Sequence, residues 1–188
     1  MVVTPSEMVP LGTVAPDFSL IDVVSERKVS LKEISTGKKA TVVMFICNHC
    51  PYVKHIQKAL VKLVAAYQAR EVGFVAINAN DVASYPDDSP ENMRQVATEW
   101  SYSFPYLYDA TQEVALAYRA ACTPDFFVFN SDLKLAYRGQ LDKARPGNDI
   151  PVTGEDLAYA LDCILAGKTI DKQQRPSAGC NIKWKQKE

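Results

Sequence analysis

The sequence predicts an α/β fold with a central mixed β-sheet flanked by helices and an N-terminal β-hairpin as an extension. Two continuous runs of apolar and β-branched residues, Ala40–Ile46 and Val72–Ala79, are typical of central strands that are covered on both faces. Apolar residues with helical spacing lie between these runs, which is the pattern of parallel strands joined by a helix. A turn signal, Asn130-Ser131-Asp132, then indicates an antiparallel hairpin before a last helical segment.

The first half of the chain contains an irregular segment, a hairpin and the first long helix. Residues 1–16 contain three prolines and are expected to form an irregular lead-in. The segments Phe18–Val23 and Arg27–Leu31 are expected to pair as the N-terminal hairpin. Residues Cys50–Arg70 follow helical spacing, with Pro51 in the opening turn, where proline is tolerated.

The segment after the second central strand contains shorter elements. Residues Pro90–Trp100 are expected to form a helix, because Ser89 precedes them as a suitable N-cap. A short extended segment follows at Tyr106–Tyr108. Residues Thr111–Ala121 are then expected to form another helix, since their apolar residues again follow helical spacing.

The last part of the chain completes the predicted sheet. Phe126–Phe129 and Leu133–Arg138 are the two strands of the antiparallel hairpin. The last helix is expected to open at Thr153 in an arrangement close to a capping box and to end before Gly167. Residues 169–188 are expected to form a C-terminal tail. Because no linker or repeat interrupts this order, the whole chain, 1–188, is predicted to be a single domain.

Composition excludes several classes of function. The chain of 188 residues has 21 basic and 22 acidic residues and a net charge of −1, so no basic field indicates binding to nucleic acid or to a membrane. The longest uncharged stretch, Ala40–Val53, is too short to span a bilayer. The N-terminal residues lack the pattern of a secretory signal, so we expect a cytoplasmic location. Five cysteines in a reducing compartment indicate catalysis or metal binding rather than structural disulfides.

Cys47-Asn48-His49-Cys50 lies where the first central strand is followed by the long helix. We expect the Cys47 thiol at the helix N-terminus, where free backbone N–H groups and the helix dipole stabilise a thiolate. Cys50, one turn away, is close enough to form a disulfide with it. Cys47 is therefore predicted to attack a substrate disulfide, and Cys50 to resolve the mixed disulfide. Asn48 and His49 are expected to tune the pair, unless His49 points to water.

Two groups of residues resemble a known superfamily. A CxxC motif at a strand–helix junction, with Thr123-Pro124 before a later strand, resembles the thioredoxin fold. The lead-in from Gly12 to Leu20, GTVAPDFSL, resembles the opening of the alkyl-hydroperoxide-reductase/thiol-specific-antioxidant (peroxiredoxin) and TlpA-like branch. The segments FICNHCPYVKHI and GCNIKW resemble a peroxiredoxin-like thioredoxin subfamily with a CNHC dithiol. The resemblance covers nearly the whole chain and implies a thioredoxin-like fold.

The resemblance also assigns a role to Thr123 and Pro124. It implies a cis proline at Pro124 that forms the floor of the dithiol site and keeps metal ions off the thiols. It further implies that the backbone of Thr123 is free to pair with an incoming substrate strand.

The sequence departs from both branches of this superfamily. Peroxiredoxins carry Thr three residues before the peroxidatic cysteine. If Cys47 is that cysteine, the position holds Met44, and if Cys50 is, the position holds Cys47. They also place an arginine beside the site, on the segment where this chain has Cys122-Thr123-Pro124. Thioredoxins have Trp before the first cysteine and a buried carboxylate in the preceding strand, whereas this chain has Ile46 and no acid there.

Two further cysteines have open roles. Cys122 lies two residues before Pro124 and either exchanges disulfides with the CxxC pair or is a small buried residue. Cys180, in the tail, resembles the resolving thiol of peroxiredoxins. The alternative is that the tail only docks through Ile182 and Trp184.

The leading prediction is a thiol–disulfide oxidoreductase that uses Cys47 and Cys50 on protein or low-molecular-weight disulfides, with an electron donor that the sequence does not identify. It needs no cofactor beyond the dithiol. One alternative is a thiol-dependent peroxidase, in which Cys47 becomes a sulfenic acid resolved by Cys50, Cys122 or Cys180. Another is a copper- or zinc-binding module with the two thiolates plus His49, His55 or Cys122 as ligands.

Overall fold

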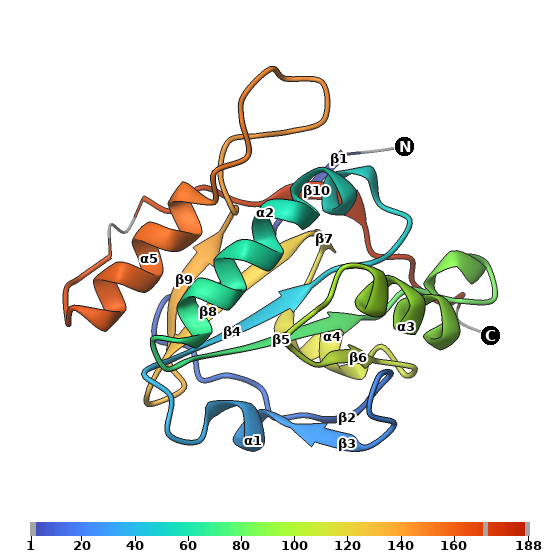
Figure 1. The fold of residues 1–188 in the computed structure, drawn as a ribbon, viewed down its shortest axis with the longest axis horizontal. Coiled ribbons are helices and arrows are strands. Elements are labelled where there is room, and N and C mark those ends of the chain that lie inside the picture. Colours follow the sequence, from blue (N-terminus) through green and yellow to red (C-terminus); the bar gives the residue numbers. More distant parts are fainter. Residues whose placement is uncertain (1–2, 171–172, 187–188) are drawn as a thin grey trace.

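The computed structural model describes residues 3–170 and 173–186 (Figure 1). Its main sheet has the strand order β3-β2-β6-β5-β4-β8-β9. These strands are β2 (Ser19–Asp22), β3 (Lys28–Ser30), β4 (Ala40–Phe45), β5 (Val72–Asn78), β6 (Tyr106–Tyr108), β8 (Asp125–Asn130) and β9 (Leu135–Gly139). The helical elements are α1 (Leu31–Ser35), α2 (Pro51–Gln68), the 3₁₀ turn η1 (Pro86–Asp88), α3 (Pro90–Glu99), α4 (Glu113–Tyr118) and α5 (Glu155–Leu165).

The centre of the sheet is mixed, as predicted. Strand β4 pairs in parallel with β5 and in antiparallel with β8, and all residues of β4 and β5 are buried. Strand β8 continues into β9 as an antiparallel hairpin, and β2 pairs with β3 as the N-terminal hairpin. The prediction of an α/β fold with a central mixed sheet and an N-terminal hairpin is therefore confirmed.

Two hydrophobic cores explain why the central strands are apolar on both faces. Val42 and Met44 of β4 pack in the core that includes residues of α2, α3 and α5. Val43 and Phe45, which point to the opposite face, pack with Tyr118 of α4 and with the lead-in. Figure 1 shows α2 lying across β4 and β8, with α4 behind the sheet.

The lead-in is not irregular throughout, contrary to the sequence prediction, and the C-terminal tail also contains a strand. Strands β1 (Val3–Pro5), β10 (Ala178–Asn181) and β7 (Cys122–Thr123) form a second sheet in the order β1-β10-β7. Pro5 does not prevent this pairing because it lies at the end of an edge strand. In Figure 1, β1 and β10 lie beside the N-terminal end of α2, and β10 contacts that helix.

Helices α4 and α5 differ from the predicted bounds for identifiable reasons. Helix α4 is shorter than the expected Thr111–Ala121, and it ends where Arg119 adopts a left-handed conformation with φ 54°. Helix α5 does not open at Thr153 but has Gly154, with φ 72°, as its N-cap. The Asp142 carboxylate binds this turn, because its Oδ2 accepts hydrogen bonds from the N–H groups of Thr153 (2.8 Å) and Gly154 (2.6 Å).

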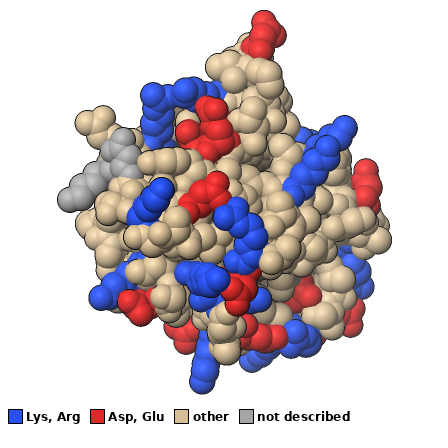
Figure 2. Space-filling view, turned by 60° about the vertical axis from the view of Figure 1, so that its left-hand side comes forward, with Lys and Arg blue, Asp and Glu red and all other residues tan. Residues whose placement is uncertain are grey.

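The surface carries mixed charge. On the face shown in Figure 2, basic and acidic side chains are interspersed, without a large field of one sign. In the described part of the chain, no helix combines the length and the apolar character that crossing a membrane requires.

A buried ion pair joins β8 to β9 on the core face that contains α4. The side chains of Asp125 and Arg138 are both fully buried, with 3.0 Å between Oδ2 and Nη2. The Arg138 guanidinium also donates to the carbonyl oxygens of Tyr118 and Arg119 and lies 3.8 Å from the ring centre of Phe127. Burial raises the pKa of Asp125 to about 6, against the opposing effect of Arg138.

We predict that Asp125→Asn destabilises the protein by about 3 to 5 kcal/mol, because it leaves the buried Arg138 charge unpaired. Urea denaturation at a pH above 6, where Asp125 is ionised, measures the free energy of unfolding of the wild type and the variant. The matched control is Asp162→Asn, which breaks the exposed ion pair with Arg70 and should change the free energy of unfolding far less. Equal losses in the two variants would contradict the prediction.

Candidate functional site

The two cysteines of the CxxC motif lie on the loop between β4 and α2, and both are buried, with 2% of Cys47 and 0% of Cys50 exposed. Helix α2 begins at Pro51, so Cys50 is its N-cap and Cys47 lies outside the helix. The prediction that the first thiol lies at the helix N-terminus is therefore wrong. The reason is Pro51, which has no N–H and a fixed φ and so suits the first helical position.

Thr123 contacts both thiols. Its Oγ1 lies 3.2 Å from Cys47 Sγ, and its carbonyl oxygen lies 3.2 Å from Cys50 Sγ, a hydrogen bond that Cys50 donates only while its thiol is protonated. The peptide bond between Thr123 and Pro124 is cis, as the resemblance implied. The backbone of Thr123, in contrast, is not free for a substrate strand, because β7 pairs with β10, with Thr123 opposite Cys180.

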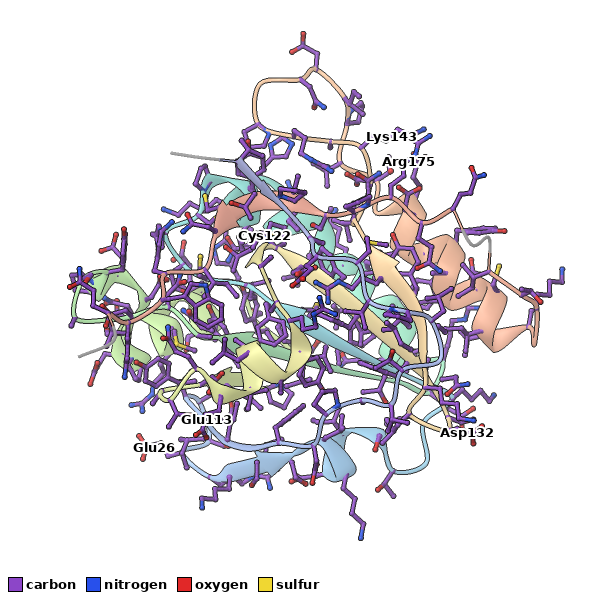
Figure 3. The ribbon with its side chains drawn as sticks, turned by 180° about the vertical axis from the view of Figure 1, so that it is seen from behind. Glu26, Glu113, Cys122, Asp132, Lys143 and Arg175 are labelled. Carbon is purple, nitrogen blue, oxygen red and sulfur yellow. The ribbon has the colours of Figure 1, made fainter. Side chains whose placement is uncertain are left out.

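The register of this pairing decides which of the two further cysteines reaches the dithiol. Cross-strand partners project to the same face of a sheet, so Cys180 lies on the face of Thr123, and its thiol hydrogen-bonds with Cys50. Cys122 projects to the other face, where its sulfur lies 4.0 Å from Ser6 Oγ and 3.7 Å from the carbonyl oxygen of Pro124. Figure 3 shows Cys122 beside β10, seen from behind.

The tail docks against the body in the same region. Ile182 is buried, and its N–H donates to the carbonyl oxygen of Ala121 (3.1 Å). The Lys183 backbone bonds with Asn80 and Asp81, whereas Trp184 stays 40% exposed. Docking of the tail and contact of Cys180 with the dithiol therefore occur together.

The surroundings of the two CxxC thiols separate their pKa values. Burial raises the pKa of Cys47 well above its usual value, and the thiol of Cys50 and the negative charge of Asp88 add to this. The pKa of Cys50 is lowered to about 5, mainly because the Cys47 thiol donates a hydrogen bond to its sulfur. The Cys180 thiol and the backbone N–H groups of Val53 and Cys180 also stabilise this thiolate. The sequence prediction expected the lowered pKa at Cys47, whereas here the lowered pKa falls on the N-cap cysteine, Cys50.

His49 and Asn48 bind a buried carboxylate that sequence inspection did not single out. Asp88 Oδ2 lies 2.6 Å from His49 Nδ1 and accepts a hydrogen bond from Asn80 (2.7 Å), while its Oδ1 accepts from the Asn48 N–H (2.7 Å). The hydrogen bond to Asp88 raises the pKa of His49. Burial alone would raise the pKa of Asp88, but the hydrogen bonds from His49, Asn80 and Asn48 outweigh it and lower that pKa. The His49 ring also stacks on Tyr85, with 5.2 Å between ring centres.

The parallel pairing of β4 and β5 could have indicated these residues. The loops that follow two adjacent parallel strands lie at the same edge of a sheet. Asn80 and Asp88 follow β5, as Asn48 and His49 follow β4.

The donor atoms of Cys47, His49 and Asp88 lie within 4.8 Å of one another, so this group could hold a metal ion. In the structure the Nδ1 of His49 and the carboxylate of Asp88 bind each other instead. Two other candidate ligands do not join this group, because His55 is exposed on α2 and Cys122 projects to the opposite face of its sheet.

A groove of about 560 Å³ lies beside Asn48, between α2 and α3. Its lining is largely polar and is formed by Asn48, Lys54, Gln57, Asp87, Asn92, Gln95, Val96, Glu99 and Trp100. The loop that carries the dithiol therefore borders an open polar surface on one side.

We predict that Asp88→Asn lowers the pKa of His49, because the variant loses both the hydrogen bond to a carboxylate and its negative charge. The chain has two histidines, so an NMR titration resolves His49, with His55→Gln to assign the signals. Because the pKa of His49 is raised on folding, the stability that the ion pair contributes is full below the unfolded pKa and is lost as pH rises through the folded pKa. An unchanged His49 titration in Asp88→Asn would contradict the assignment.

Comparison with known proteins identifies the family. A model of the AhpC/TSA family matches residues 11–138. A conserved protein of Geobacillus kaustophilus is 56% identical with a TM-score of 0.97, and the match covers 100% of this chain and 99% of that one. A protein of Sinorhizobium meliloti is 45% identical with a TM-score of 0.94, covering 97% of this chain and 98% of its own. A search of the curated proteins found no match.

A more distant structure confirms the fold. The thioredoxin domain of a thiol-disulfide oxidoreductase from Bacteroides vulgatus is 17% identical with a TM-score of 0.62, and the match covers 82% of this chain and 99% of that domain. The fold is therefore thioredoxin-like. Because the family model matches well over half of the sequence, the chain belongs to the AhpC/TSA family.

Proposed function

We propose that the protein is a thiol–disulfide oxidoreductase whose dithiol is Cys47 and Cys50 and whose substrates are protein or low-molecular-weight disulfides. The observation that supports this most is the placement of both CxxC sulfurs at the start of α2, each 3.2 Å from an oxygen of Thr123. In this arrangement the pKa of Cys50 is lowered and that of Cys47 is raised. A thiolate beside a protonated partner is the arrangement that disulfide exchange requires. Membership of the AhpC/TSA family supports a redox role.

The order of the two cysteines follows from their ionisation. The sequence predicted Cys47 as the nucleophile, but the lower pKa of Cys50 favours Cys50 in that role. Its thiolate attacks one sulfur of the substrate disulfide, forms a mixed disulfide and releases the first substrate thiolate, which takes up the proton of Cys47. The Cys47 thiolate then attacks Cys50 Sγ, forms the Cys47–Cys50 bond and releases the second thiolate. The substrate gains two electrons, and the dithiol loses them.

The neighbouring residues position this pair. The side chain of Asn48 donates to the carbonyl oxygen of Asp87 (2.8 Å) and accepts from the Tyr106 hydroxyl (3.0 Å), which fixes the loop between the cysteines. His49 holds Asp88, whose charge raises the pKa of Cys47 and so keeps its proton in place. Thr123 and Pro124 form the floor, with the Thr123 hydroxyl against Cys47.

A thiol-dependent peroxidase is the second candidate, and the match to the AhpC/TSA family favours it. In that reaction the Cys50 thiolate attacks a peroxide oxygen, becomes a sulfenic acid and releases water or an alcohol. Cys47 then displaces water from it and forms the same disulfide. The buried Arg138 does not assist, because its guanidinium is bonded to Asp125 and to two backbone carbonyls.

We predict that a Cys47–Cys50 disulfide forms and titrates between about −270 and −120 mV in glutathione buffers, the range of known dithiol oxidoreductases. Alkylation of free thiols followed by mass spectrometry of the peptides measures this. Cys47→Ser and Cys50→Ser should lose both this bond and the reduction of a model disulfide, whereas Cys163→Ser, on α5, should keep them. Turnover of hydrogen peroxide but not of disulfides would favour the peroxidase, and a protein without the bond would refute both.

We also predict that the ultraviolet absorbance of a thiolate appears as pH rises through about 5 and that Cys50→Ser abolishes this step. In Cys47→Ala the step should move to higher pH, because the main hydrogen bond to the Cys50 thiolate is lost. Cys163→Ser serves as the control. Loss of the step in Cys47→Ala, with retention in Cys50→Ser, would restore Cys47 as the nucleophile.

A further inference from the structure

Strand β10 occupies the place beside the dithiol that the resemblance assigned to a substrate. It pairs with β7 in antiparallel, with Cys180 opposite Thr123 and Asn181 opposite Cys122. Because Thr123 contacts Cys47 and Cys50, the strand that pairs with Thr123 reaches the reacting sulfurs. The chain thus supplies a strand of its own at this edge, with a cysteine at the position nearest the dithiol.

Several contacts hold β10 firmly in this place. Strand β1 pairs with its other edge, with Val3 opposite Cys180. Before the strand, the Ser177 hydroxyl donates to the carbonyl oxygen of Pro124 at 2.6 Å. A Cβ atom at Gly179 would clash with the carbonyl oxygen of Thr123, so only glycine permits this close approach. Cys180 is therefore a fixed neighbour of the site rather than a residue of a loose tail.

The sulfur of Cys50 lies between two other thiols. Cys50 Sγ lies 3.2 Å from the carbonyl oxygen of Thr123, the residue opposite Cys180 in the β7–β10 pairing, and hydrogen bonding from Cys47 and Cys180 lowers the pKa of Cys50. Cys180 is 1% exposed and packs in the same core as the dithiol. Burial, together with the Cys50 thiolate, raises the pKa of Cys180 to about 12, so its proton stays in place while Cys50 is ionised.

We propose that Cys180 is a third redox thiol, and that Cys50 exchanges between two disulfides, Cys47–Cys50 and Cys50–Cys180. This rests on the proposed function. The Cys180 sulfur, on losing its proton, attacks Sγ of Cys50 in the Cys47–Cys50 disulfide. The new S–S bond forms as the old one breaks, and the electron pair leaves with Cys47, which takes up the proton. The exchange involves no net oxidation, so it needs no further reactant.

The consequence is an oxidised site with two isomeric forms. In one, the disulfide is Cys47–Cys50 and Cys180 is a thiol. In the other, Cys180 takes the position of a substrate sulfur in the mixed disulfide, and Cys47 is again a free thiol next to Thr123. Cys122 does not take part, because it faces Ser6 and Asp125 on the opposite side of β7.

The test is disulfide mapping of full-length variants oxidised with diamide, with alkylation and mass spectrometry as the readout. Cys47→Ser should form an intramolecular Cys50–Cys180 disulfide in a yield comparable with that of Cys47–Cys50 in the wild type. Cys47→Ser/Cys122→Ser should form it equally well, and Cys47→Ser/Cys180→Ser should form no intramolecular disulfide. Circular dichroism confirms that each variant is folded.

Two results separate this inference from the proposed function. If the wild type forms Cys47–Cys50 but folded Cys47→Ser leaves Cys50 and Cys180 as free thiols, the third-thiol proposal is overturned and the oxidoreductase stands. If the wild type forms no Cys47–Cys50 disulfide, the proposed function fails. The oxidised wild type should contain both disulfides, and its lack of a Cys50–Cys180 disulfide would also overturn the proposal. The single variant Cys180→Ser should contain only the Cys47–Cys50 disulfide.

Discussion

The contacts of Thr123 hold the site together. Its hydroxyl touches Cys47, its carbonyl oxygen lies 3.2 Å from the Cys50 sulfur, and its backbone pairs with the strand that contains Cys180. One residue thus places three sulfurs around a common point, although they come from distant parts of the sequence. The position of Thr123 itself depends on β8, which follows Pro124 directly and is the antiparallel neighbour of β4, the strand that leads to Cys47.

Asp88 sets the electrostatics of this arrangement. It is fully buried and binds the loop after β4 through Asn48 and His49, and the loop after β5 through Asn80. Because its charge lies on the Cys47 side of the pair, it opposes ionisation of Cys47. Cys50, at the N-cap, is faced by thiols and backbone N–H groups instead. The same carboxylate therefore fixes the geometry of the loop and the order in which its thiols lose their protons.

Local patterns in the sequence were sufficient for the sheet and the dithiol. The apolar runs of β4 and β5, the turn after β8 and the CxxC motif are each signals that lie within a short stretch of consecutive residues. The pairing of Val3–Pro5 with residues 178–181 has no such local signal, since each segment is short and its partner lies at the other end of the chain. Helix α2 shows a finer limit of prediction from sequence. Its approximate length was predictable but its exact first residue was not, and that residue decides which cysteine is the N-cap.

The place of β10 in the chain has a consequence for biosynthesis. Strand β10 follows every other described strand and helix, yet it covers the dithiol and pairs with both β1 and β7. A ribosome therefore delivers Cys47 and Cys50 long before the segment that encloses them. Until that segment emerges, the nascent polypeptide lacks the strand that pairs with β7 and covers the thiol pair.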